Sequence, residues 1–70
     1  MLKVKIYQLT QDFNFPLLHP EGGSEKVNSG EFIVTIDNSV YIQNTKDCLI
    51  YSTVSPDFIE LNDKIFSDIT

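Results

Sequence analysis

Residues 32–43 read FIVTIDNSVYIQ, and this stretch decides the fold that the sequence predicts. Apart from Ile33, apolar and polar residues alternate over residues 31–37, which is the period of a β-strand. Residues 37–39 (Asp-Asn-Ser) are typical turn formers, and the alternation resumes over residues 40–43. We therefore predict a tight β-hairpin over residues 32–43. One face of its first strand should carry Phe32, Val34 and Ile36, and the other Glu31, Ile33, Thr35 and Asp37.

The segment that follows predicts a third strand of the same meander. Residues 44–47 (Asn-Thr-Lys-Asp) form a second turn, and residues 48–54 form a strand that ends at Ser55-Pro56-Asp57, because proline removes a ladder donor. Its two faces should carry Cys48, Ile50 and Val54 on one side and Leu49 and Tyr51 on the other. Residues 58–61 are expected to form a short closing strand. Asn62 is then expected to cap one or two helical turns, and a frayed tail is the alternative.

The segment that precedes the hairpin begins with a half-buried strand. Leu2, Val4 and Ile6 alternate with Lys3, Lys5 and Tyr7. A connection over residues 11–30 follows, which is long for a compact domain and contains two prolines and three glycines. The apolar groups of its first half are expected to pack on the core, or to leave one or two exposed as partner anchors. These groups are Phe13, Phe15, Leu17 and Leu18.

The composition bounds the class of protein. Seventy residues predict one small, mostly β domain over residues 1–70, which buries about 60% of the surface of its unfolded chain. Cys48 is the one cysteine, so no intramolecular disulfide forms, and a lone thiol favours a reducing compartment. No apolar stretch approaches the roughly 20 residues of a membrane helix, and the N-terminus lacks the apolar core of a signal peptide. We expect a cytoplasmic protein without a membrane partner.

The net charge limits the kinds of partner that this chain can bind. Five lysines stand against ten acidic residues, which gives a net charge of −5, and arginine is absent. This balance repels a nucleic-acid backbone and lacks the guanidinium fork that recognises phosphate and guanine, so we expect no direct nucleic-acid binding. A basic protein partner suits the charge, including one that itself binds nucleic acid. Abundant Ile, Asn, Lys, Phe and Tyr without Ala or Arg would suit an AT-rich genome, such as that of a low-GC bacterium or its phage.

Two segments resemble the SH3-like β-barrel family. Residues 29–34 (SGEFIV) are similar to the family's diverging turn, and residues 55–61 (SPDFIEL) to the closing segment, in which a short 3₁₀ turn precedes the last strand. The resemblance implies a small five-stranded barrel whose long loop after the first strand occupies the place of the RT loop. An OB-like five-stranded barrel is the alternative. In either barrel, closure would bury a core and leave few open edges.

The resemblance is incomplete at the family's proline-rich peptide groove. The paired-tryptophan position has no tryptophan, and Val40 and Tyr41 are the nearest candidates. Pro56 and Phe58 match the groove's proline and aromatic residue, and Tyr7 could supply another ring. Because the groove needs aromatic walls for a polyproline helix, we do not expect polyproline binding.

The residues that could carry chemistry do not assemble into a catalytic pattern. His19, the one histidine, lies near Glu21 and Glu25 but lacks the further ligands that a metal site needs. Cys48 follows Asp47, an acidic neighbour that disfavours a thiolate. Residues 21–26 (EGGSEK) lack the spacing of a phosphate-binding loop. We therefore predict no enzyme, no cofactor and no metal.

The candidate partner-binding surface is the acidic, aromatic C-terminal end, together with the apolar start of the long connection. Residues 57–70 hold four acidic residues against one lysine, Lys64. Aromatic side chains in such a surface can act as anchors, whereas a solvated end is the other interpretation. The candidate residues are Asp57, Phe58, Glu60, Asp63, Phe66, Phe13 and Phe15.

These observations predict a small acidic protein-binding module. The favoured role is a phage-encoded inhibitor or modulator of a host nucleic-acid-handling protein. The first alternative is a homo-oligomeric or virion-associated structural subunit that assembles through Phe13, Phe15, Leu17 and Leu18. The second alternative is an accessory subunit of a large enzyme such as RNA polymerase.

Overall fold

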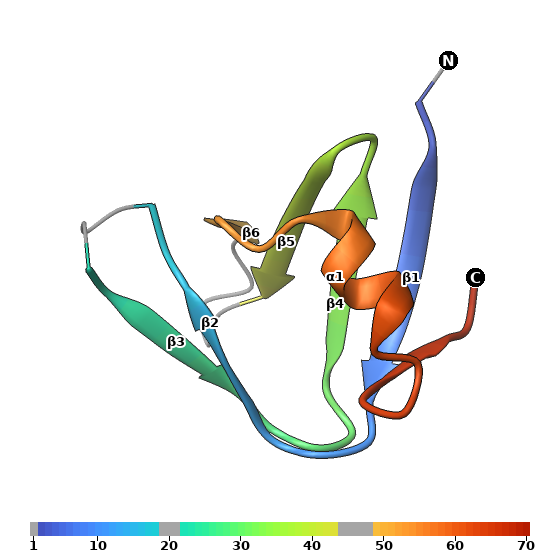
Figure 1. The fold of residues 1–70 in the computed structure, drawn as a ribbon, viewed down its shortest axis with the longest axis horizontal. Coiled ribbons are helices and arrows are strands. Elements are labelled where there is room, and N and C mark those ends of the chain that lie inside the picture. Colours follow the sequence, from blue (N-terminus) through green and yellow to red (C-terminus); the bar gives the residue numbers. More distant parts are fainter. Residues whose placement is uncertain (1, 19–21, 44–48) are drawn as a thin grey trace.

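The computed structural model describes residues 2–18, 22–43 and 49–70. These residues form a mostly β structure with one short helix (Figure 1). A five-stranded antiparallel sheet has the order β6-β5-β4-β1-β7, and a separate two-stranded ribbon pairs β2 with β3. The elements are β1 (Val4–Leu9), β2 (Phe13–Pro16), β3 (Ser24–Val27), β4 (Phe32–Ile36), β5 (Ser39–Gln43), β6 (Leu49–Ser52), α1 (Pro56–Leu61) and β7 (Phe66–Asp68).

The predicted hairpin is confirmed as β4 and β5. Ile36 pairs with Ser39, so the connection is the two residues Asp37 and Asn38. Asp37 adopts a φ of 53°, in the left-handed region that aspartate tolerates better than most residues. Its carboxylate accepts a hydrogen bond from the backbone N–H of Lys3 at 2.9 Å, and its own N–H donates to the Lys3 carbonyl at 2.8 Å. The turn is thereby tied to the start of β1.

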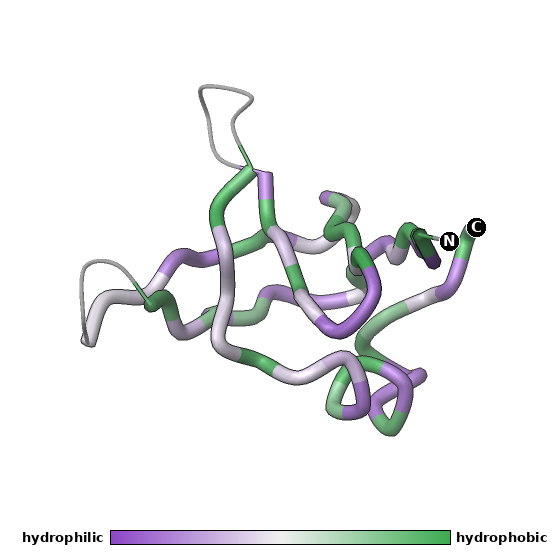
Figure 2. The backbone as a smooth tube through the Cα atoms, turned by 90° about the horizontal axis from the view of Figure 1, so that it is seen from above, coloured by the Kyte–Doolittle hydropathy of each residue, from purple (hydrophilic) through white to green (hydrophobic). Residues whose placement is uncertain are grey.

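The core lies on the opposite face of β1 from the one that the alternation favoured. Tyr7 and Leu9 are buried, whereas Val4 and Ile6 are exposed. Ile33 and Thr35 are likewise the buried residues of β4. Register joins these positions into one inward row, in which Tyr7 pairs with Ile33, Ile33 with Ile42, and Ile42 with Ile50. The exposed positions of β1 and β4 are as apolar as the buried ones, so periodicity alone does not select the buried face. Figure 2 shows the hydropathy of each residue along the chain.

The long connection over residues 11–30 contains the β2–β3 ribbon where a loop was expected. Phe13 pairs with Val27, and Phe15 with Glu25. Phe15 and Val27 are buried, and Phe13 and Leu17 pack against the core, as predicted for these apolar groups, while Leu18 stays exposed. The ribbon turns back to β4 through Gly30, which has a φ of 90° that favours glycine, and its N–H donates to the Leu9 carbonyl at 2.8 Å.

The C-terminal segment reverses the predicted order of strand and helix. Residues 58–61, expected to form a short closing strand, belong to α1, and the expected helical turns contain β7, which pairs with β1. The Ser55 hydroxyl accepts the backbone N–H of Phe58 at 3.3 Å, and Pro56 occupies the first helical turn, where its missing N–H costs nothing. Asn62, the predicted N-cap, is the C-cap.

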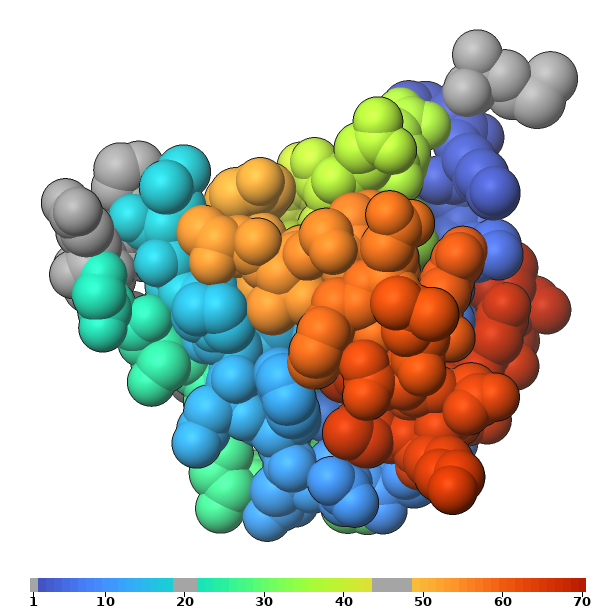
Figure 3. Space-filling view, in the orientation of Figure 1, coloured from blue at the N-terminus to red at the C-terminus, as the bar shows by residue number. Residues whose placement is uncertain are grey.

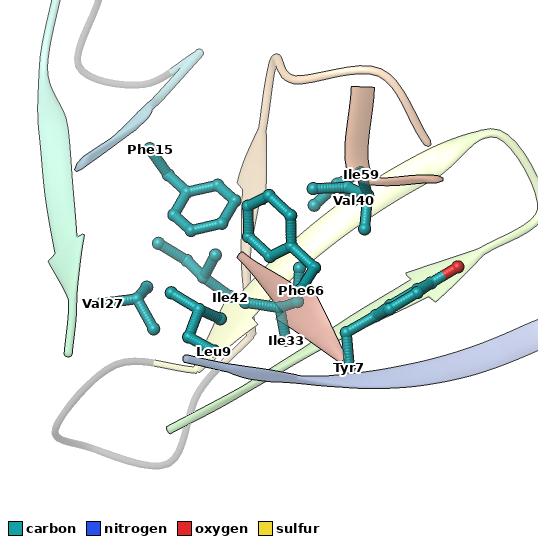
Figure 4. Packing of buried hydrophobic residues seen from close by; sticks show 9 residues of the cluster. All are labelled: Tyr7, Leu9, Phe15, Val27, Ile33, Val40, Ile42, Ile59 and Phe66. Atoms are coloured by element: carbon teal, nitrogen blue, oxygen red, sulfur yellow. The ribbon is translucent and has the colours of Figure 1, made fainter. Parts of the chain in front are cut away.

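The ribbon and α1 cover one face of the five-stranded sheet and enclose the core between them. Phe15 of β2, Ile59 of α1 and Phe66 of β7 meet the inward residues of the sheet (Figure 4). The ribbon also meets the β6 edge, where the Thr53 N–H and the Ser52 hydroxyl both donate to the Pro16 carbonyl. The two sheets nevertheless do not close into a barrel, and the predicted five-stranded barrel is corrected to this open arrangement.

Helix α1 is attached to this core through Ile59, and a matched pair of variants tests that attachment. Ile59 is 0% exposed and Leu61 is 83% exposed on the same helix. Ile59→Ala should lower the free energy of unfolding by about 2–5 kcal/mol, because it leaves a cavity. Leu61→Ala should change it by less than about 0.5 kcal/mol. Urea denaturation followed by circular dichroism measures both; equal losses would contradict the packing of α1.

Asp12 joins the start of β2 to the turn before β4. Its carboxylate accepts the Ser29 N–H at 2.8 Å and lies 3.4 Å from the Lys26 ammonium. The hydrogen bond from Ser29, and then Lys26, lower the pKa of this carboxyl from its usual 3.8. A depressed pKa means that the folded state favours the ionised carboxylate. Its stabilisation is therefore fully present above the pKa of the unfolded chain, and it is lost as the pH falls through the lower pKa of the folded protein.

Asp12→Asn should therefore lower the urea midpoint at neutral pH, and its difference from the unmodified protein should shrink as pH falls below about 4. Asp63→Asn removes the same charge outside this turn and serves as the control for net charge. The contrary result is a difference in urea midpoint that stays constant from neutral to acid pH. It would show that Asp12 stabilises the fold without its charge.

Candidate functional site

The seven candidate residues separate into a buried pair and a surface set. Phe15 and Phe66 are 0% and 1% exposed. They are core residues and cannot contact a partner directly, which corrects their inclusion in the binding surface. Phe13 is half-buried and Phe58 is 37% exposed. Asp57, Glu60 and Asp63 are exposed on α1 and just after it.

The four phenylalanines form one cluster that joins the core to the surface. The ring centroids of Phe13 lie 4.9 Å from Phe15, 5.6 Å from Phe66 and 5.7 Å from Phe58. Phe58 and Phe66 are 6.3 Å apart. These separations and tilted or edge-on geometries are those of favourable aromatic pairs. The buried rings of Phe15 and Phe66 (Figure 4) thus hold the two outer rings in place.

An apolar hollow lies between β2 and α1, where the two outer rings reach the surface. Its volume is about 370 Å³, and its lining residues are Phe13, Pro16, Val54, Ser55 and Phe58. The space-filling view shows α1 and β2 next to each other on this face (Figure 3). The hydroxyl of Ser55 caps α1, so the hollow offers mainly carbon atoms to a ligand. We name this site the Phe13–Phe58 hollow.

Local structure sets the position of Phe58. The Ser55 cap accepts its N–H, and the Asn62 side-chain amide donates to its carbonyl at 2.7 Å. Phe58 is therefore bound at both of its backbone groups within the first turn of the helix. A helix of six residues would be marginal on its own. These two bonds and the buried Ile59 fix the ring without a long helix behind it.

The carboxylates lie along a different side of α1 from the hollow. Glu60 is 3.7 Å from the Lys5 ammonium. On one side of this ion pair, a depression of about 270 Å³ includes Asp63 and Asp68 in its lining. On the other, a depression of about 250 Å³ includes Asp57. The structure thus brings the candidate acidic residues into one row beside Lys5, and none of them lines the hollow.

Two titratable groups near this row have shifted pKa values. Burial raises the pKa of the Tyr7 hydroxyl. Hydrogen bonds from Thr70 lower the pKa of Asp68, whose carboxylate accepts the Thr70 N–H at 3.0 Å. Asp68 is therefore ionised in the folded protein near neutral pH and adds to the negative charge beside α1.

Of the other groups considered as candidates for chemistry, His19, Glu21 and Cys48 lie outside the described residues. Ser24 to Lys26 of the glycine-containing stretch belong to β3. In the part of the chain that the structure describes, no three His, Cys, Asp or Glu side chains group as metal ligands. Sequence reasoning missed Pro16 and Val54 as lining residues, and the alternation of Phe13 and Phe15 opposite Val27 was the signal that could have revealed the ribbon.

Two further findings bear on identity. Within residues 2–18, 22–43 and 49–70, no helix has the length and apolar character needed to cross a membrane. Comparisons with known protein families, curated proteins and solved structures found no match for this chain. The function is therefore inferred from the site itself.

Proposed function

We propose that this chain is a protein-binding module that docks on a basic surface of another protein through the Phe13–Phe58 hollow and the carboxylates of α1. The observation that carries this proposal is the pair of outer rings, held 5.7 Å apart over a hollow of about 370 Å³. Because buried neighbours pre-position both rings, binding an apolar side chain costs little ordering entropy.

The hollow supplies an apolar anchor site. Aromatic residues at the centre of an interface dominate its energy, and a hollow of this size lies at the lower end of the range of roughly 300–1,000 Å³ for ligand pockets. The hollow is large enough for one or two apolar side chains of a partner segment and too small for an extended surface. The partner should therefore present an apolar residue next to its cationic groups.

The carboxylate row supplies the electrostatic part. Glu60 is already balanced in part by Lys5, so Asp57 and Asp63 are the carboxylates best able to attract a cationic partner. Exposed charges of this kind raise the association rate and select partners more than they add affinity. A protein that handles nucleic acid fits this chemistry, since its phosphate-binding surface is rich in lysine and arginine. An inhibitor of phage origin and an accessory subunit of RNA polymerase would both use such a contact.

The finer fold proposal is an open SH3-like arrangement. The order β6-β5-β4-β1-β7, the ribbon that follows β1 and precedes β4 in the chain, and the helical segment before β7 support it. In this proposal the ribbon takes the place of the RT loop and α1 that of the short 3₁₀ turn. The hollow then lies between those two segments, beside Pro56 and Phe58. Fold analogy by itself does not define the ligand, so the proposal on function depends on the hollow and the charges.

Variants on the two sides of α1 test the proposed docking. Phe58→Ala should weaken partner binding by about tenfold or more, as expected for an aromatic anchor. Asp57→Lys should weaken it mainly at low ionic strength, where exposed charges are least screened. Tagged protein retrieves the partner from the lysate of a low-GC bacterium, and the purified partner is then titrated by calorimetry at low and moderate salt.

Two matched controls separate the site from general effects. Leu61→Ala removes an exposed apolar side chain of the same helix, and Glu25→Lys makes the same charge reversal on β3. Both should bind as the unmodified protein does, and circular dichroism should show that every variant is folded. Binding that is indifferent to Phe58→Ala and Asp57→Lys would refute docking at this site.

A further inference from the structure

The outer face of the five-stranded sheet, which points away from the ribbon and α1, is also apolar. Strand register places its residues in rows across the sheet. In one row Ile6 pairs with Val34, Val34 with Tyr41, and Tyr41 with Tyr51. The rings of Tyr41 and Tyr51 lie 5.8 Å apart, and Ile69 extends the row, since its N–H donates to the Ile6 carbonyl at 3.0 Å. A second row pairs Val4 with Ile36.

Much of this face is accessible to solvent. Val34, Ile36 and Tyr41 on this face are partly buried. Its other large apolar side chains, together with Leu2 just before β1, are between 39% and 69% exposed; they are Leu2, Val4, Ile6, Phe32, Leu49, Tyr51 and Ile69. With about 150–250 Å² for a large side chain, these fractions give roughly 600 Å² of exposed apolar surface. That is at the upper end of the roughly 300–600 Å² found for the largest patch on a typical monomer.

The face carries no charge within the described residues. Its polar positions are Gln8, Ser39, Gln43 and Ser67. The described acidic residues lie instead on the ribbon, in turns, on α1 or on the opposite face of β7. A charged partner therefore gains no electrostatic attraction from this face. A second copy of the chain can approach it without bringing like charges together, although each copy has a net charge of −5.

We propose that this outer face packs against the same face of a second copy of the chain to form a two-fold symmetric dimer. Two such faces would bury roughly 1,200 Å² in total, which exceeds the roughly 1,000 Å² expected of a specific interface. Stacked sheets pack about 10 Å apart with side chains interdigitated, and a symmetric dimer uses the same patch on both subunits. Tyrosine is enriched in such interfaces.

This dimer goes beyond the proposed function because it uses the face of the sheet opposite the Phe13–Phe58 hollow. The two hollows would then lie on the two outer sides of the dimer. A partner with two cationic segments could engage both, and the second contact would form at a raised effective concentration. The interface itself contains no ion pair among the described residues, so salt should not weaken it.

The test is the mass of the full chain in solution by sedimentation equilibrium, from micromolar to submillimolar concentration and at low and high salt. The expected result is a dimer of the 8.0 kDa chain that high salt leaves intact or strengthens. Ile6→Lys should raise the dissociation constant by about 100-fold or more, since it buries an unpaired charge. Leu49→Lys makes the same change at a more exposed position, should Ile6→Lys fail to fold.

Leu61→Lys on α1 is the matched control and should leave the dimer intact. A monomer at all concentrations, a higher oligomer, or a dimer that Ile6→Lys and Leu49→Lys both preserve would overturn this proposal. A dimer abolished by high salt would overturn it as well. None of these outcomes bears on the docking site, because partner binding at the hollow should be weakened by Phe58→Ala and by salt, whereas the dimer should respond to neither.

Discussion

The structure depends on the packing of Phe15 against Phe66, with ring centroids 5.9 Å apart and both side chains almost completely buried. Phe15 comes from the ribbon, and Phe66 from the strand after α1, fifty-one positions later in the chain. Their contact therefore joins the ribbon to β7, two segments that share no backbone ladder with each other. It also determines where Phe13 and Phe58 emerge, so the same contact that closes the core shapes the hollow.

The parts of the fold that were predictable from sequence are those specified locally. The hairpin of β4 and β5 follows from alternation on both sides of a two-residue turn, and its register needs no distant partner. The division of β6 into two faces also follows from alternation, and the structure shows that the face with Leu49 and Tyr51 is the exposed one. The choice of buried face in β1 and β4 does not follow, because Val4 and Ile6 are as apolar as Tyr7 and Leu9. Only the tertiary partners Ile59 and Phe66 decide it.

The end of the chain shows how competing signals mislead. Ser55-Pro56-Asp57 both breaks a strand and begins a helix, and the second effect prevails because the Ser55 hydroxyl satisfies the Phe58 N–H. For the candidate site, sequence reasoning found both outer rings and the three carboxylates beside α1. It could not separate Phe13 and Phe58 from Phe15 and Phe66, since all four are phenylalanines and only the fold distinguishes a core ring from a surface one.

A small antiparallel sheet usually buries one face and leaves the other polar. Here Lys5 lies on the covered face, paired with Glu60, while Ile6 and Val34 lie on the open one. If these residues exchanged faces, the open face would be polar, as in a conventional monomer. The observed pattern instead exposes an apolar surface to water, which is unfavourable. This unfavourable exposure is removed if a partner covers the open face. The occupant that matches it in chemistry, in extent and in lack of charge is the same face of another copy.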